Sequence, residues 1–181
     1  WRDHHEYVWV MTRVKEYPVT AALLLSELSF LLLLRTFDDP ILIAKGFFFA
    51  SSLILIEIRD GLTHEIPDLY LLPVLASGLL DFQPAPAIEG AFTVSLALML
   101  TSRLTHGSIS GGDVKFMAAA GFVLGPVGVT GGALMGLLAF WVIHLFRRNH
   151  NHCEKKIAYA MAPWLGPGCF IAYLLTGGMT A

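Results

Sequence analysis

Residues 110–126 read SGGDVKFMAAAGFVLGP, a polar start with paired glycines that runs directly into an apolar segment. The carboxylate of Asp113 and the ammonium of Lys115 stand at the edge of that segment. A charge beside hydrocarbon is costly and is usually retained where it has a function. A second carboxylate in a similar setting, Asp60, follows an apolar segment further upstream. We interpret the rest of the chain as a scaffold that brings Asp60 and Asp113 together.

The composition indicates a membrane protein. Of the 181 residues, 55% are hydrophobic and 14% are charged, whereas soluble domains typically contain about 25% charged residues. Few charges and several long apolar segments are typical of a polytopic membrane protein. No basic patch interleaved with aromatic residues is present, so we expect no nucleic-acid partner. The two cysteines form neither a disulfide framework nor a paired metal motif.

The apolar segments predict an all-α fold, a polytopic membrane helix bundle of about six transmembrane segments, some short or broken. Their predicted bounds are 19–34, 41–58, 69–80, 88–104, 114–146 and 157–176. A membrane span needs about 20 apolar residues, so the third segment is short. The fifth is too long for one helix, and Gly125-Pro126 predicts a break before a full span over 127–146.

The polar start of the chain predicts a separate segment. Residues 1–16 are expected to be cytoplasmic, and residues 17–181 are expected to form the membrane-embedded core. The chain starts at Trp1 rather than Met, so we expect the natural N-terminus to lie upstream.

The basic residues predict the orientation of the bundle. Cytoplasmic loops of membrane proteins carry an excess of Lys and Arg. Most of the 12 basic residues fall in or beside four regions that would share one side of the membrane: 1–17, 59–68, 103–113 and 147–156. This topology puts Asp60 and Asp113 at the same cytoplasmic edge. Lys45, one turn into its span, is expected to snorkel outward, and Glu27, in mid-span, is expected to have a polar partner inside the bundle.

Most of these charged residues also have a simpler structural interpretation. Asp113 and Asp60 can each cap a helix end, since aspartate is favoured there. Asp68 is expected to cap the third segment. Lys115 is expected to be an interfacial anchor or the charge partner of an aspartate. Glu57, one turn before Asp60, is expected to be a paired edge residue or to tune the site.

Other residue groups give weaker signals. His150, His152 and Cys153 are flanked by basic residues that repel a cation, so we expect a solvated loop there and no metal site. The glycines between 125 and 136 favour close helix packing.

Two carboxylates at one membrane edge are the components of an aspartyl dyad. Such a pair shares a proton because two nearby carboxylates do not both ionise easily. The ionised member then activates water while the protonated member polarises a carbonyl group. Gly111 and Gly112 are expected to supply close backbone approach and free dihedral angles beside Asp113. A similar bend is expected at Asp60-Gly61.

Three sequence blocks resemble the type IV prepilin peptidase family, whose members are membrane aspartyl proteases of the GxGD kind. The first is DGLTHEIPD at 60–68, running into LLP at 71–73, and the second is GGDVK at 111–115, followed by AAAG at 118–121. The third is APWLGP at 162–167, and YPV at 17–19 is similar to the start of the family's peptidase core. Ser110 stands where the first glycine of the GxGD pattern is expected.

The resemblance implies that Asp60 and Asp113 are catalytic, with Gly111, Gly112, Lys115 and Pro67 shaping the site or binding substrate. The substrates would be prepilins or pseudopilins of a type IV pilus or type II secretion system, cut at the cytoplasmic face of the bacterial inner membrane. No metal or organic cofactor would be needed. Many members also carry a cysteine-rich methylation segment, and this sequence resembles the peptidase core without it, by nature or by trimming.

Two other functions remain open. In a small transporter or proton-relay protein, charged residues would line an ion path near the middle of the membrane. A non-catalytic pilus or secretion assembly subunit would keep the fold, with Asp60 and Asp113 dispensable or too far apart to share a proton.

Overall fold

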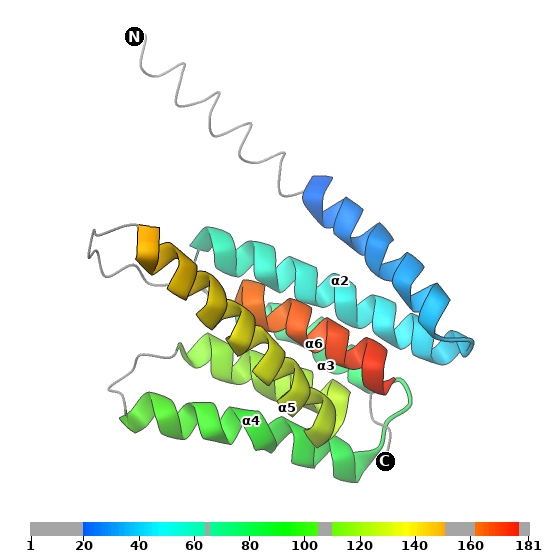
Figure 1. Cartoon of the computed structure of the whole chain (residues 1–181). Helices are drawn as coiled ribbons and strands as arrows, with labels where there is room; N and C mark the ends of the chain where they lie inside the picture. Colours follow the sequence, from blue (N-terminus) through cyan, green and yellow to red (C-terminus); the bar gives the residue numbers. More distant parts are fainter. Residues whose placement is uncertain (1–19, 64–65, 105–109, 151–161, 178–181) are drawn as a thin grey trace, which may run out of the picture.

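The computed structural model describes residues 20–63, 66–104, 110–150 and 162–177. Within these ranges the chain is helical, with short turns and no strand (Figure 1). A first helix over residues 20–36 is followed by α2 (Pro40–Thr63), the 3-10 turn η1 (Asp68–Tyr70), α3 (Leu71–Gly78), α4 (Pro84–Leu104), α5 (Gly111–His150) and α6 (Ala162–Thr176). The all-α prediction is confirmed, and each predicted apolar segment overlaps one helix. The predicted polar segment over 1–16 lies outside the described residues.

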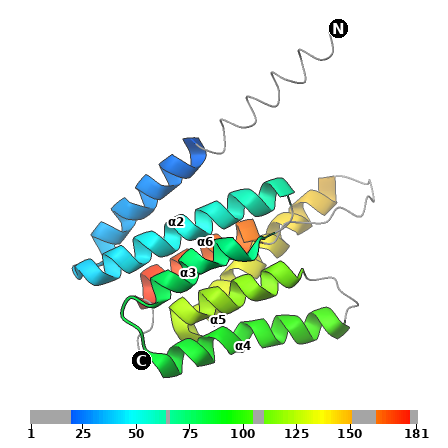
Figure 2. The same ribbon diagram turned by 180° about the vertical axis from the view of Figure 1, so that it is seen from behind.

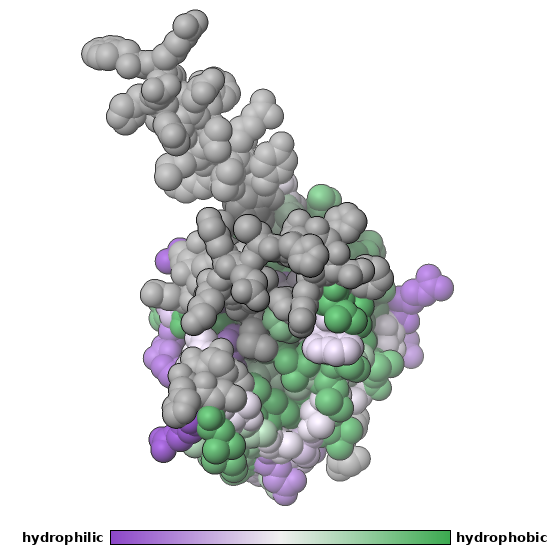
Figure 3. Space-filling view, turned by 60° about the vertical axis from the view of Figure 1, so that its left-hand side comes forward, coloured by the Kyte–Doolittle hydropathy of each residue, from purple (hydrophilic) through white to green (hydrophobic). Residues whose placement is uncertain are grey.

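Three stretches are long and apolar enough to cross a membrane, by length and composition: Pro40–Asp60, Pro84–Leu104 and Gly111–Ile143. The helical stretch Asp68–Gly78 is apolar but shorter, as predicted for the third segment. Large apolar side chains are exposed along the helices, among them Leu31, Phe92, Leu138 and Trp141. Figure 3 shows such residues gathered over one face of the molecule. Soluble monomers rarely expose apolar patches of that extent, and a bilayer accounts for them.

Helix α5 is the centre of the bundle. It packs most extensively against α4 and α6, and α3 lies between α5 and α2 (Figure 2). The buried core draws on α2, α5 and α6, with Phe49, Phe116, Met117 and Tyr173 among its large side chains. The first helix leans away from this bundle in both ribbon views.

A sharp break divides α5. Gly125 has φ 70° and ψ 178°, and Pro126 follows it. Backbone in this region is essentially restricted to glycine. The segment before the break packs against α4, where Gly90 lies against the backbone of Gly121 and Gly125. The segment after it packs against α6, where Gly132 and Gly136 meet the α6 backbone. The predicted break is confirmed, and so is close packing at these two glycines, whereas Gly131 faces open space.

Three sequence-based expectations about α2 and the first helix are wrong. Helix α2 continues to Thr63, so Asp60 and Gly61 form no bend. A single glycine costs a helix only about 1 kcal/mol relative to alanine, which packing overrides. Glu27 is exposed on the first helix and has no hydrogen bond or ion pair with any other described residue.

The third error concerns Lys45, which does not snorkel outward. Its side chain is 0% exposed, and Nζ has no hydrogen-bond partner among the described residues. The neighbouring position explains the burial, because Leu33 of the first helix and Tyr173 of α6 both close over Gly46. Asp81, in the turn before α4, attracts the amine electrostatically.

Candidate active site

The two predicted aspartates meet at one end of the bundle. Asp60 lies in the last turns of α2 and Asp113 in the first turn of α5. Each is only 5% exposed, and the two carboxylates are close enough to interact electrostatically. Aspartates are rarely this buried unless they are paired or hydrogen-bonded. Residues far apart in the sequence therefore form one buried pair.

A backbone amide of α6 supports Asp60. The N–H of Ala162 donates a hydrogen bond to Oδ2 of Asp60 at 3.2 Å. Ala162 is the first residue of α6, where N–H groups have no partner within the helix and the helix dipole favours negative charge. Sequence reasoning did not identify this contact. Pro163 could have indicated the contact from the sequence. Proline is common in the first turn of a helix, where backbone N–H groups are free to bind a carboxylate.

Ser110 caps the helix that carries Asp113. Its Oγ accepts a hydrogen bond from the N–H of Gly112 at 3.2 Å. In return, the backbone N–H of Ser110 donates to the carboxylate of Asp113. This reciprocal arrangement resembles a capping box, with Asp113 as its acidic third residue, except that the serine hydroxyl binds the second N–H of the helix rather than the third. Ser110 therefore occupies the N-cap position of α5, and the Asp113 carboxylate contributes to the cap from the first turn. The serine that replaces the expected glycine has a structural role, because it fixes the start of α5.

The two glycines before Asp113 differ in their surroundings. A Cβ at Gly112 would lie 3.3 Å from the Cβ of Ile66, so the first turn of α5 packs tightly against that side chain. The expected close approach of a substrate backbone stays a prediction. A Cβ at Gly111 would have no heavy atom within 4 Å. Both residues lie inside the first turn of α5, and neither has a positive φ. The expected special dihedral angles are therefore absent at both positions.

Lys115 of α5 forms an ion pair with Asp68, which lies after Asp60 in the sequence. Its Nζ donates to both carboxylate oxygens of Asp68, at 2.7 and 2.9 Å. The pairing with an aspartate is as predicted, whereas the capping role expected for Asp68 is wrong, since no side chain caps α3. Pro67 directs Asp68 outward because its extended conformation (φ −64°, ψ 138°) starts the 3-10 turn, which the bond from Tyr70 N–H to Pro67 C=O closes at 3.0 Å.

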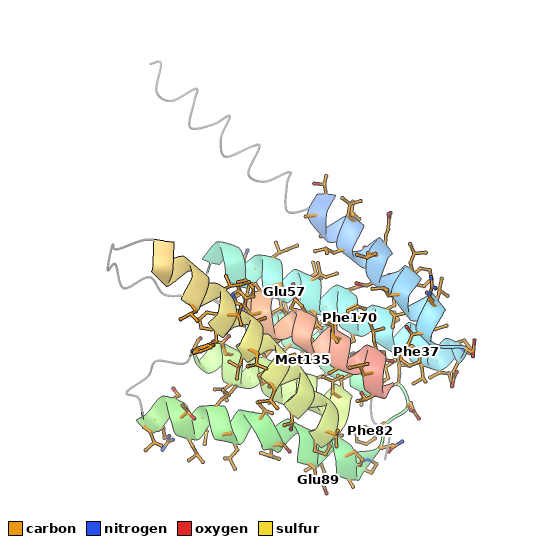
Figure 4. All side chains as sticks on the ribbon, in the orientation of Figure 1. Phe37, Glu57, Phe82, Glu89, Met135 and Phe170 are labelled. Carbon is orange, nitrogen blue, oxygen red and sulfur yellow. The ribbon has the colours of Figure 1, made fainter. Side chains whose placement is uncertain are left out.

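A third carboxyl group, Glu57, lies one helical turn before Asp60. It is half-buried, and its carboxylate packs on Gly166 of α6 so closely that any Cβ there would collide with it. Figure 4 shows Glu57 where α2 runs beside α6, with Phe37 at the opposite end of the helices. Glu57 therefore lines the α2–α6 contact next to the aspartate pair.

The described residues contain no group of three or more His, Cys, Asp or Glu side chains that could hold a metal ion. The side chains of His150, His152 and Cys153 lie outside the described residues. The expectation of a metal-free loop at these positions stays a prediction.

The fold and the site define an all-helical membrane protein in which two buried carboxylates meet at one end of the bundle. The type IV leader peptidase family matches residues 47–179, and the chain belongs to that family. It is 31% identical over 133 residues to the prepilin leader peptidase/N-methyltransferase of Bacillus subtilis (strain 168). This region is 70% of the chain and 53% of the relative, so the chain spans about half the length of that protein. No solved structure matches the chain.

Proposed function

We propose that the chain is a membrane aspartyl endopeptidase that removes the leader peptide of type IV prepilins or pseudopilins. The observation that carries this proposal is the buried pair formed by Asp60 and Asp113, each 5% exposed. Membership of the type IV leader peptidase family supports it, as does the similarity to the prepilin leader peptidase/N-methyltransferase of Bacillus subtilis.

The pair acts on water and on the scissile carbonyl group. The ionised carboxylate accepts a proton as water attacks the carbonyl carbon, and the protonated carboxyl donates its proton to the carbonyl oxygen. The tetrahedral gem-diol then breaks its C–N bond. One hydroxyl group returns its proton to the ionised carboxylate as the C=O bond re-forms, and the protonated carboxyl gives its proton to the leaving amine. The N–H of Ala162 remains bonded to Asp60 throughout and stabilises negative charge on it.

Four neighbouring residues shape this site. Gly112 leaves room for Ile66 against the first turn of α5, and Gly111 leaves the exposed start of α5 without a side chain. Through Asp68, Pro67 and Lys115 fix the segment that contains Ile66. An extended substrate would enter along this exposed edge.

The proposed location is the bacterial cytoplasmic membrane, with residues 17–181 as the embedded core and the aspartates at the cytoplasmic edge. The excess of basic residues in the loops beside the aspartates supports this orientation. The cleaved prepilins or pseudopilins would belong to a type IV pilus or a type II secretion system. An apolar pilin helix lying in the same bilayer would present its leader junction at that edge.

The test is leader removal from a prepilin by the full chain in detergent or lipid. We expect Asp60→Asn and Asp113→Asn each to lower kcat by about 10²- to 10⁴-fold, the usual contribution of acid–base groups. Asp38→Asn, an exposed aspartate at the opposite end of α2, is the matched control and should retain the parent rate. If either dyad variant cleaves at the parent rate, the proposal fails.

A further inference from the structure

An ion pair links the two sequence blocks that carry the aspartates. Asp68 follows Asp60 along the chain, and Lys115 follows Asp113. The ammonium of Lys115 reaches both oxygens of the Asp68 carboxylate, at 2.7 and 2.9 Å. Since both oxygens are engaged, the contact fixes the direction of the Asp68 side chain as well as its distance.

Three contacts connect the sequence block around Asp60 with the block around Asp113. Asp60 and Asp113 interact through their carboxylates, the side chain of Ile66 lies against Gly112, and Asp68 bonds to Lys115. Ile66 and Asp68 therefore both lie against the first turns of α5. The ion pair is the outermost of these contacts, with the side chains of Lys115 and Asp68 57% and 72% exposed.

We propose that the pair between Asp68 and Lys115 is a positioning clamp that holds Asp60 and Asp113 at the separation their reaction requires. The proposal rests on the dyad function proposed above. Asp68 and Lys115 touch neither the reacting water nor the scissile bond, and they act through the segments that carry the two aspartates.

Because the ion pair between Asp68 and Lys115 is exposed, a role in positioning the aspartates can be distinguished from a role in stability. An exposed ion pair adds little to stability, so breaking it should shift the unfolding temperature by about 4 °C or less. Catalysis is far more sensitive to geometry, because a displacement of about 1 Å can cost 10²-fold in rate. A clamp therefore predicts a large effect on kcat with a small effect on folding.

A double-mutant cycle with the full chain and a prepilin tests the clamp. We expect Asp68→Asn and Lys115→Met each to lower kcat about tenfold, with KM changed less than about twofold. The double variant should be no slower than the slower single variant, because either change opens the same contact. The variants Asp68→Glu and Lys115→Arg keep a charge-assisted pair and should recover at least about a third of the parent kcat.

Two control variants remove exposed charges outside the proposed clamp. Arg103→Met removes an exposed cation near the same end of the bundle, and Asp38→Asn removes an exposed aspartate at the other end. Both should retain the parent kcat. High salt should slow the parent, since it screens an exposed pair, and should leave the rate of Lys115→Met unchanged.

Three results would overturn the clamp. They are single variants with the parent kcat, single losses that multiply in the double variant, or a loss expressed in KM alone, which would indicate substrate binding. A failure of the clamp differs from a failure of the dyad. If Asp60→Asn and Asp113→Asn are inactive while Asp68→Asn and Lys115→Met match the parent, only the clamp is wrong.

Discussion

The contrast between Gly111 and Gly112 gives a prediction that isolates one contact at the site. The two residues are adjacent in the first turn of α5. Replacing Gly112 by alanine would put a Cβ 3.3 Å from the Cβ of Ile66 and 3.4 Å from Oγ of Ser110. The same change at Gly111 would meet no heavy atom within 4 Å. Gly111→Ala is therefore the matched control for Gly112→Ala.

The size of the effect can be worked out from the geometry. Carbon atoms pack at about 3.5–4.0 Å, so Gly112→Ala displaces Ile66 or the start of α5 by a few tenths of an ångström. Since about 1 Å of misplacement can cost 10²-fold in rate, we expect kcat to fall about threefold to tenfold. Folding should be preserved in both variants, because alanine is favoured over glycine in a helix by about 1 kcal/mol.

The assay is the initial rate of leader removal from a prepilin over a range of substrate concentrations, with unfolding temperature measured in the same detergent. Gly111→Ala, whose added Cβ meets no heavy atom within 4 Å, should lower kcat by less than Gly112→Ala does. Equal rates for the two alanine variants would refute the reasoning, since they would show that the contact between Ile66 and Gly112 does not position the site. A large fall in unfolding temperature for Gly112→Ala would refute it as well.

Three further predictions concern stability and are checked by thermal or denaturant unfolding in detergent. Gly121→Ala drives a Cβ into the α4 backbone and should lower the free energy of unfolding by about 1–3 kcal/mol. Gly131→Ala adds a Cβ in open space and should raise the same free energy by up to about 1 kcal/mol. Equal effects of the two variants would contradict the packing described. Lys45→Met removes a buried amine without a hydrogen bond and should raise this free energy by about 1–3 kcal/mol, so a loss of stability would show that the amine has a favourable role. Tyr173→Phe removes the 2.7 Å hydrogen bond from its hydroxyl to a carbonyl of α2 and should cost about 1 kcal/mol, and an unchanged stability would show that this bond contributes nothing.

Features encoded along a single segment could be predicted from the sequence. Apolar length gave the helices, and the Gly125-Pro126 pair gave the break in α5 because both residues act on their own backbone. The loop charges indicated that Asp60 and Asp113 lie at the same end. Their proximity in the structure is consistent with that topology.

Features that depend on lateral neighbours could not be predicted. Lys45 is buried because helices from both ends of the chain close over α2 beside it, and no local pattern reports that. Glu27 was expected to face the bundle, but the first helix leans outward and leaves it exposed. Asp68 has the sequence context of a cap, yet Lys115 offers its carboxylate a charged partner. Tertiary packing decides whether the Asp68 carboxylate binds the N–H groups of its own helix or the ammonium of Lys115.

The break at Gly125 has a consequence for insertions and deletions in α5. Each residue added to a helix rotates the segment after the insertion by about 100° relative to the segment before it. One residue added between Asp113 and Gly125 would leave the second half of α5 seated on α6 and turn Asp113 away from Asp60. One residue added between Gly125 and Gly132 would leave Asp113 in place and turn Gly132 and Gly136 off the α6 backbone. The two halves of α5 therefore keep separate helical registers. The pairing of Asp113 with Asp60 limits the length of the first half, and packing on α6 limits the length of the second.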